Sequence, residues 1–152
     1  MITCEPTHDL QRVRDTILAP NNLPWAFRSP LEYFTWRPQL KPGILYLACY
    51  QDGVYQGLIA TVEQSETRCE GHIAFLPIAF GHTVTLGQTC LDWIWEHTRF
   101  REIVAPVVEG NLLARRFLMK LGFEHFQTIP KGWIKDGRCH DLELFKIDKS
   151  II

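Results

Sequence analysis

The stretch "EIVAPVVEGNLLARRFLMKLGFEHFQTIPKGWIKDGRCHDLELFKI", residues 102–147, decides the fold. It opens with a short apolar run that is typical of a buried strand. Residues 111–122 then have a helical period: Asn111 can cap the helix and Gly122 is placed to end it. Two β-rich runs follow, joined around Asp136-Gly137. The stretch therefore predicts a strand, a helix and a hairpin. The apolar face of the helix comprises Leu113, Ala114, Phe117, Leu118 and Leu121.

The central part of the chain predicts three strands and a second helix. Residues 44–64 contain two β-rich runs around Asp52-Gly53, which is a strong hairpin signal. Residues 69–80 form a third run, in which Pro77 indicates a ladder defect or a strand end. After a bend at Gly81, residues 84–98 have a helical period. The apolar stripe of that helix comprises Leu86, Cys90, Leu91 and Ile94.

The N-terminal part predicts a strand over 1–7 and a helix over 7–18 that Thr7 or Asp9 can cap. A proline-broken segment over 19–43 holds a short helix after Ser29, with Pro30 at its first position. This segment is rich in aromatic residues, which pack on the sheet as a lid or line a wall for a ligand. These aromatic residues are Trp25, Phe27, Tyr33, Phe34 and Trp36.

The predicted order is β, α, α, β, β, β, α, β, α, β, β. This order indicates an α/β (α+β) fold with helices packed on a mixed sheet. The 152 residues suffice for one domain with a substantial core, so we expect a single domain over 1–152.

Charge and cysteine content narrow the function classes. The net charge of −1 gives no general attraction to nucleic acid or to an anionic membrane. The five cysteines are widely spaced without a C-x-x-C motif, which argues against a disulfide scaffold or zinc site and for a reducing compartment. The start "MITCEPTHDL" is unlike a signal peptide, and no apolar run is long enough to span a membrane. We therefore expect a cytoplasmic protein without a metal.

The stretch that decides the fold resembles the GNAT superfamily of N-acetyltransferases, most of all the group that acetylates the N-termini of ribosomal proteins. In that group an Asn follows a strand, the next helix ends in K-x-G-F, and G-x-x-x-D precedes the final strand. The chain matches this pattern without a gap. The matching positions are Asn111, Ala114, Arg116, Lys120, Gly122, Phe123, Gly137 and Asp141. As a small and divergent GNAT-like chain, it also resembles proteins that are encoded by bacteriophages.

The resemblance extends upstream and implies a fold. The family carries P-x-x-W-G-x-G at the end of its fourth strand, and Pro77, Phe80 and Gly81 match, with Phe for Trp. Members have a mixed, mostly antiparallel sheet whose fourth and fifth strands splay apart, with helices on both faces. The resemblance implies the same architecture here.

The resemblance also implies a binding site for acetyl-coenzyme A in the gap between the splayed strands. In the family the pantetheine arm bonds to the fourth strand and the pyrophosphate sits on the next helix N-terminus, which favours anions. By position, Ile78, Ala79 and Phe80 face the pantetheine, and Asn111 lies near the sulfur. The residues that surround the phosphates are His82, Thr83, Val84, Thr85, Leu86 and Gly87.

Two departures from the family pattern bear on this site. Thr83 and Thr85 replace small residues, and β-branched threonine resists positive φ. The two threonines either crowd the pyrophosphate or donate hydroxyl hydrogen bonds to it. The second departure is Leu118, which stands where many members carry a tyrosine that protonates the leaving thiolate. Gln127 and Pro130 also differ from the family, so the choice of acceptor cannot be carried over.

Several residues are candidates for a general base. His72 and Glu70 are two apart on the fourth strand and share one face, either as a base pair or as a packed histidine beside an edge carboxylate. Glu109 is read as a solvated charge. Cys139 and His140 are adjacent on a strand and so point to opposite faces. Arg115 and Arg116, by contrast, open a basic helix face that meets the adenosine 3′-phosphate or stays solvated.

Two functions follow. The first is an acetyl-coenzyme A-dependent N-acetyltransferase that acts on a small-molecule amine or peptide N-terminus by direct transfer. The alternative is a GNAT-fold protein without catalysis, serving in binding or in phage particle assembly. A homo-oligomer is compatible with both, and a nucleic-acid-binding role is disfavoured.

Overall fold

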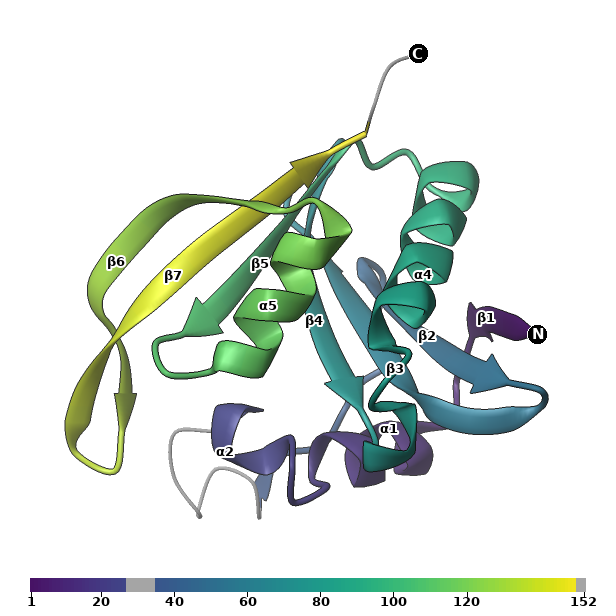
Figure 1. Ribbon diagram of the computed structural model, residues 1–152, viewed down its shortest axis with the longest axis horizontal. Coiled ribbons are helices and arrows are strands. Elements are labelled where there is room, and N and C mark those ends of the chain that lie inside the picture. Colours follow the sequence, from purple (N-terminus) through teal and green to yellow (C-terminus); the bar gives the residue numbers. More distant parts are fainter. Residues whose placement is uncertain (27–34, 150–152) are drawn as a thin grey trace.

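The structure is a computed structural model that describes residues 1–26 and 35–149, and its centre is a mixed sheet with strand order β1-β2-β3-β4-β5-β7-β6 (Figure 1). The β4–β5 pairing is parallel, and every other neighbouring pair is antiparallel. The strands are β1 (Ile2–Pro6), β2 (Ile44–Gln51), β3 (Val54–Glu63), β4 (Arg68–Phe75), β5 (Glu102–Val108), β6 (Glu124–Lys135) and β7 (Arg138–Asp148).

Helices cover both faces of this sheet, as predicted (Figure 1). On one face α4 and α5 pack over a large apolar cluster that includes Leu47, Ile94 and Phe145. On the other face Val13 of α1 packs against Leu58 and the nearby strand residues. The helical elements are α1 (Leu10–Ile17), α2 (Leu23–Ala26), the 3₁₀ turn η1 (Pro77–Ala79), α4 (Thr83–His97) and α5 (Leu112–Leu121).

The local sequence signals explain the helix ends. Asp9 caps α1 by accepting a hydrogen bond from the Arg12 N–H, and Asn111 caps α5 by accepting from the Ala114 N–H. Gly122 ends α5 in the left-handed region, with φ of 100°. These predictions are confirmed. Phe27, Tyr33, Phe34 and the predicted helix at Pro30 lie outside the described residues.

The apolar stripe predicted for α5 is wrong at one position. Phe117, Leu118 and Leu121 are buried, but Leu113 is 70% exposed. Leu113 lies in the first turn of the helix, and the packed stripe begins one residue later, at Ala114.

Both predicted hairpins are present with the turn chemistry that their sequences imply. Asp52 and Gly53 have φ of 49° and 82°, and Asp136 and Gly137 have φ of 50° and 78°. Two successive positive φ values match the twist of a two-residue β-hairpin. The hairpins join β2 to β3 and β6 to β7.

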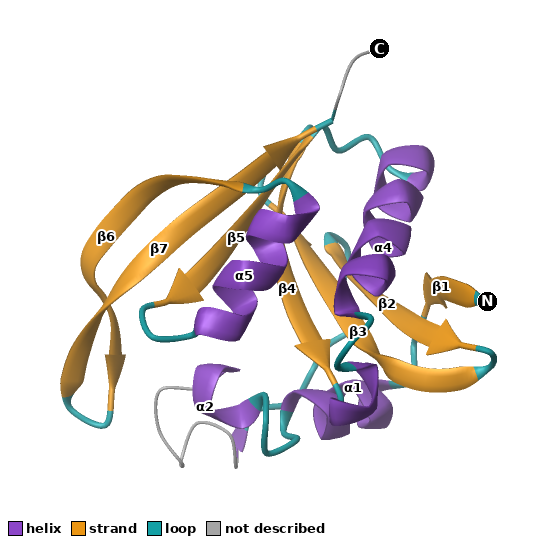
Figure 2. Ribbon diagram, viewed as in Figure 1, coloured by secondary structure: helices purple, strands orange, loops and turns teal. Residues whose placement is uncertain are grey.

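The fourth and fifth strands splay apart, which confirms the arrangement that the resemblance implied. Their ladder covers three pairs and ends at Glu70 opposite Val104. Beyond that point β4 runs on to Phe75 and β5 to Val108 with no further pairing between them. Figure 2 shows the two arrows diverging, with α5 beside β5 and α4 starting beyond the end of β4. We call the space between these unpaired strand ends the gap.

Candidate functional site

The β4 wall of the gap presents backbone groups that are not paired with a neighbouring strand. The Leu76 N–H donates to the Gln56 carbonyl of β3 at 2.9 Å, so this peptide directs its N–H away from the gap. Because the C=O and N–H of one trans peptide point in opposite directions, the Phe75 carbonyl points into the gap. Backbone direction alternates along a strand, so the peptide groups of Ile73 face the gap as well.

The β5 wall contains a proline at the matching depth. Glu109 N–H donates to Asp141 O at 3.0 Å, and Lys149 N–H donates to Arg101 O at 2.7 Å, so odd-numbered positions of this strand bond to β7. Pro106 is at an even position, and its nitrogen therefore faces the gap. A proline inside a sheet removes one ladder hydrogen bond. At Pro106 no hydrogen bond between β4 and β5 is lost, because β4 has already diverged from β5.

The end of β4 differs from the sequence-based expectation. The strand predicted to reach Phe80 ends at Phe75, because η1 begins at Pro77. Ile78 and Phe80 are 57% and 51% exposed, while Ala79 is fully buried. Ile78, Ala79 and Phe80 therefore follow the strand as a turn instead of continuing its gap-facing edge.

The turn into α4 needs only one special conformation. Gly81 has φ of 102°, which favours glycine, whereas Thr83 is already the first residue of the helix and Thr85 lies within it. Neither threonine is among the residues with positive φ. The concern that threonine would strain this turn is thus removed by the structure.

The N-terminus of α4 carries backbone donors for an anion. Among the described residues, the N–H groups of Gly81, Thr83, Val84 and Thr85 have no recorded acceptor. The first N–H groups of a helix point outward, and the helix dipole favours negative charge there. This end of α4 lies directly beyond the end of β4, so the gap and the free donors are consecutive along the chain (Figure 1).

Three of the six predicted phosphate neighbours use their N–H groups or side chains elsewhere. His82 N–H donates to Ala79 O at 3.1 Å, and Leu86 N–H donates to His82 O at 3.2 Å. Leu86 is fully buried in the core. Gly87 is also buried, and a Cβ there would lie 2.6 Å from Phe117 Cζ. Leu86 and Gly87 therefore contribute to the packing of α4 in the core. Fewer backbone N–H groups are left to bind a phosphate than the sequence indicated.

His82 contributes an oriented side chain beside this turn. Its Nε2 lies 2.7 Å from Oε1 of Gln56, a buried side chain on β3. Gln56 Nε2 donates to Val54 O at 3.0 Å, so Gln56 Oε1 is the acceptor and His82 Nε2 carries a proton. The other imidazole nitrogen, Nδ1, is left to act as an acceptor or, when protonated, as a second donor.

The predicted pair on β4 is formed: His72 Nε2 lies 2.8 Å from Glu70 Oε1. The second carboxylate oxygen of Glu70 accepts from Gln64 Nε2 at 3.0 Å. The hydrogen bond from His72 is the largest cause that lowers the pKa of Glu70, with smaller help from the charge of His72 and from Gln64, against a burial effect that raises it. Glu70 therefore stays a carboxylate that holds His72 Nε2–H, and Nδ1 becomes the basic atom of the half-exposed imidazole.

The pair lies where the strands begin to separate. Glu70 is the last β4 residue paired with β5, and His72 follows two residues later on the same face. That face is the one covered by α1, since the next residue on it, Ala74, packs with Val13.

Asn111 and Glu109 lie at the end of β5. Asn111 Oδ1 accepts from Ala114 N–H at 3.3 Å, so its carboxamide is tied to the start of α5. Glu109 was interpreted as a solvated charge, but its Oε1 accepts from Asp141 N–H at 3.1 Å and lies 3.6 Å from His140 Nδ1. Glu109 therefore links the ends of β5 and β7.

The remaining residues considered in the sequence analysis differ in their contacts and exposure. Arg115 Nη1 bonds both carboxylate oxygens of Glu143, at 3.1 and 2.9 Å, whereas Arg116 is exposed. Leu118 is buried in the core, and Cys139 is exposed on the β6–β7 hairpin.

One pair of residues at the gap was missed by the sequence analysis. Asn21 Nδ2 and Asn22 Nδ2 donate to the gap-facing Phe75 carbonyl at 2.8 and 3.0 Å. Both belong to the loop between α1 and α2. No motif signals this role, because two asparagines after a helix are equally typical of a turn.

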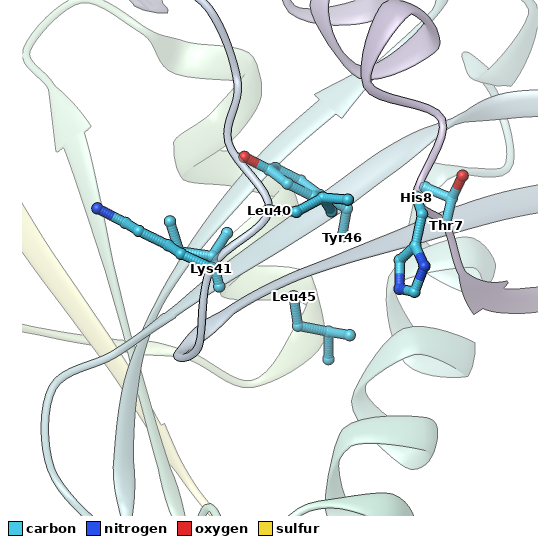
Figure 3. Close-up of a pocket in the computed structure, with 7 residues that line it drawn as sticks. Thr7, His8, Leu40, Lys41, Leu45 and Tyr46 are labelled. Atoms are coloured by element: carbon cyan, nitrogen blue, oxygen red, sulfur yellow. The ribbon is translucent and has the colours of Figure 1, made fainter.

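Pockets lie on the α1 side of the sheet and at its edge. One of about 420 Å³ is lined by the α1 cap Asp9, by α1 residues that include Arg12 and Asp15, and by Leu76 just beyond β4. Another, of about 180 Å³, lies at the start of β2, where Tyr46, Leu40 and His8 surround it and Lys41 extends away (Figure 3). Of the two, the first adjoins the end of β4.

The described residues contain neither a metal-binding cluster nor a membrane-spanning helix. Residues 1–26 and 35–149 contain no group of three His, Cys, Asp or Glu side chains placed to hold a metal ion. None of the helices within those ranges is long and apolar enough to cross a membrane.

The splayed strands, the turn at Gly81 and the donor-bearing helix define a fold class: the chain has the fold of the GNAT acetyltransferases. No family model matches the sequence, and no curated protein matches it in sequence. The likeness is therefore one of structure.

Three solved structures illustrate this likeness. Spermidine N-acetyltransferase of Vibrio cholerae, in complex with coenzyme A and spermine, matches with a TM-score of 0.69 at 16% identity, covering 97% of this chain and 95% of that one. A candidate phosphinothricin N-acetyltransferase matches with a TM-score of 0.74 at 16% identity, covering 99% and 100%. The ribosomal L7/L12 α-N-protein acetyltransferase RimL, in complex with coenzyme A, matches with a TM-score of 0.62 at 9% identity, covering 69% and 62%.

Proposed function

We propose that the protein transfers an acetyl group from acetyl-coenzyme A to a primary amine or a peptide N-terminus. The observation that carries the proposal is the continuity of the gap with the N-terminus of α4. The gap-facing backbone groups of Ile73 and Phe75, which pair with no strand, lead along β4 to the free N–H groups of Gly81, Thr83, Val84 and Thr85. An extended amide-containing arm that ends in a pyrophosphate is complementary to this path.

Each part of the path has a chemical role in the proposal. The α4 N–H groups and the helix dipole hold the pyrophosphate, and the hydroxyls of Thr83 and Thr85 add donors. The gap-facing Ile73 N–H is a backbone donor for the oxyanion that develops when the amine attacks the thioester carbon. Such donors are effective because they are fixed before the reaction begins.

We assign the general base to His72, oriented by Glu70. The ionised Glu70 carboxylate fixes the proton on His72 Nε2, so Nδ1 accepts a proton from the acceptor ammonium to give the attacking amine, or from the amine nitrogen as it attacks. The C–N bond forms to give the oxyanion, the C–S bond then breaks as the carbonyl is restored, and the sulfur leaves as a thiolate. Since Leu118 is buried and cannot donate a proton, the thiolate takes its proton from water.

The neighbouring enzymes support this class of reaction. The structures compared include enzymes named for spermidine and for a ribosomal protein N-terminus, two of them in complex with coenzyme A. Both acceptors are primary amines, so the acceptor chemistry proposed for this chain is the one that they share.

Calorimetry with coenzyme A and acetyl-coenzyme A tests the proposal. We expect a dissociation constant in the micromolar range. Thiol release from acetyl-coenzyme A is then followed with spermidine and with peptides as acceptors, in the wild type and in His72→Ala. His72→Ala should bind coenzyme A normally and lose about 10²-fold or more in rate. Absence of binding at millimolar coenzyme A would contradict the proposal and favour a non-catalytic binding or assembly role.

A further inference from the structure

The side chain of Asn21 enters the open end of the gap. Its Nδ2 donates to the Phe75 carbonyl at 2.8 Å and to Asn22 Oδ1 at 3.2 Å. Asn22 Nδ2 in turn donates to Phe75 O at 3.0 Å and to Thr16 O at 2.9 Å. Because the Phe75 carbonyl points into the gap, the two carboxamides occupy the side of β4 that a paired strand would otherwise cover.

The network fixes which way the Asn21 carboxamide points. With Nδ2 on two acceptors, a flipped amide would set its oxygen against the Phe75 carbonyl oxygen. The loop itself is held, since the N–H groups of Asn22 and Leu23 both donate to Ala19 O at 2.9 Å. The position of Asn21 Oδ1 is therefore determined by its surroundings.

Within the part of the chain that the structure describes, Asn21 Oδ1 has no hydrogen-bond partner. The atom is shielded from solvent, and no group within residues 1–26 and 35–149 donates a hydrogen bond to it. Buried polar atoms are normally satisfied, so an exception at a candidate site calls for a missing donor. An amide oxygen accepts and cannot donate, which restricts the missing group to an N–H or O–H.

We propose that Asn21 is a ligand-binding residue whose Oδ1 accepts a hydrogen bond from an N–H group of the molecule held in the gap between β4 and β5. This inference rests on the proposed function, which puts two sources of such a group in the gap. One is an amide of the pantetheine arm, and the other is the amine acceptor. Both present an N–H to the same oxygen, and the experiment separates them.

The test compares Asn21→Leu with Asn22→Ala. Asn21→Leu keeps the approximate size of the side chain and removes the acceptor oxygen. Asn22→Ala is the matched control, because it removes a donor to the same Phe75 carbonyl and the weaker 3.2 Å acceptor of Asn21 Nδ2, while the 2.8 Å bond to Phe75 O still orients the Asn21 carboxamide. Calorimetry uses coenzyme A and adenosine 3′,5′-bisphosphate, which lacks the pantetheine arm. Thiol-release assays give KM and kcat for spermidine and for a peptide N-terminus.

A pantetheine contact predicts that Asn21→Leu weakens coenzyme A binding by about tenfold and leaves the bisphosphate affinity unchanged. A contact with the acceptor predicts unchanged coenzyme A affinity and a raised KM for the amine. Asn22→Ala should show neither effect. In ¹⁵N-labelled wild-type protein, the Asn21 side-chain amide signals should shift when the contacting ligand is added, which requires no variant.

The negative outcomes are distinct. If the wild type binds coenzyme A, and Asn21→Leu neither weakens that binding nor raises the KM of any amine, the inference is overturned and the proposed function stands. The same holds if the Asn21 amide signals do not move with either ligand. If the wild type fails to bind coenzyme A at all, the proposed function falls and the inference falls with it.

Discussion

The imidazole Nε2 of His82 and the amide Oε1 of Gln56 lie 2.7 Å apart and connect the N-terminus of α4 to β3. Gln56 is 2% exposed, and its Nε2 is bonded to Val54 O. The turn that leads from the gap to the free donors of α4 is thus attached to the sheet by one buried side chain.

We predict that Gln56→Leu lowers the free energy of unfolding by about 1–3 kcal/mol, because His82 Nε2–H and Val54 O both lose their partner. Chemical denaturation measures this change. In the double variant with His82→Ala, the two losses should be less than additive by about 0.5 kcal/mol or more, as for residues in contact. Additive losses would show that the two side chains do not interact in solution.

Gly81→Ala should weaken coenzyme A binding. Gly81 has φ of 102°, and a Cβ there meets nothing within 4 Å, so the cost is backbone strain of about 1–2 kcal/mol and not a clash. Relief of that strain would move the donors of α4, and we expect about a tenfold loss in affinity by calorimetry.

Gly137→Ala is the control for that variant. Gly137 also has a positive φ, of 78°, and open space around its Cβ position, but it lies in the β6–β7 hairpin. It should lower stability similarly and leave coenzyme A affinity unchanged. Equal effects of both variants on affinity would refute the role given to the Gly81 turn.

Gly87→Ala should destabilise the protein by overpacking. The added Cβ would lie 2.6 Å from Phe117 Cζ and 2.8 Å from Leu121 Cδ1. Phe117 is buried and packs edge-on against Phe75 with ring centroids 5.6 Å apart, so it has little room to move. We expect a loss of about 1–3 kcal/mol in denaturant unfolding. Phe117→Leu in the Gly87→Ala background should recover part of this loss; a further additive loss would show that the two sites are not in contact.

The Glu70–His72 pair predicts acid sensitivity. The pKa of Glu70 is lowered below its ordinary value of 4.5, chiefly by the hydrogen bond from His72. A lowered folded-state pKa contributes stability that is fully present above the unfolded value and is lost as pH falls through the folded value. Glu70→Gln should therefore be less stable than wild type at pH 6, and the difference should shrink as pH falls below 4.5.

Thermal denaturation at a series of pH values measures that difference. Glu66→Gln, on the exposed turn between β3 and β4, controls for removal of one surface carboxylate. A stability difference between Glu70→Gln and wild type that is the same at pH 3 and pH 6 would contradict the prediction.

Thiol reactivity should divide the five cysteines into two classes. Burial raises the pKa of Cys69 to about 12, and hydrogen bonds from Cys4 and Cys49 raise the pKa of Cys90. The hydrogen bond with Cys90 lowers the pKa of the half-exposed Cys4, and Cys139 is exposed. Since the thiolate is the reactive form, iodoacetamide should modify Cys4 and Cys139 in the folded protein, and Cys49, Cys69 and Cys90 only after unfolding. Peptide mass spectrometry identifies the sites, and labelling of Cys69 before unfolding would contradict the packing described.

The sequence predicts the elements well because their signals are local. The Asp-Gly turns, the Asn111 cap and Gly122 each act within a few residues, and all are present in the structure. The strand over 69–80 is overestimated, because an apolar run with a proline does not show whether Pro77 bends a strand or ends it.

The candidate site is only partly predictable, since its contacts are long-range. A shared strand face brings His72 to Glu70, as periodicity indicated. The bonds of His82 to Gln56 and of Asn21 to Phe75 join residues 26 and 54 positions apart, and no spacing rule connects them. Likewise, Leu86 and Gly87 follow a phosphate-binding motif in sequence, yet their environment in the structure is the interior.

Pro106 helps to keep the ends of β4 and β5 from pairing across the gap. Without the proline, the diverging strands would be able to pair by backbone hydrogen bonds and exclude a ligand. A residue without an amide hydrogen at this depth withholds the bond that such closure would require. A ligand that binds between these strand ends therefore has no β4–β5 hydrogen bond to break at this position. Because proline lacks an amide hydrogen in every state of the chain, the missing hydrogen bond at Pro106 is the same with and without a ligand.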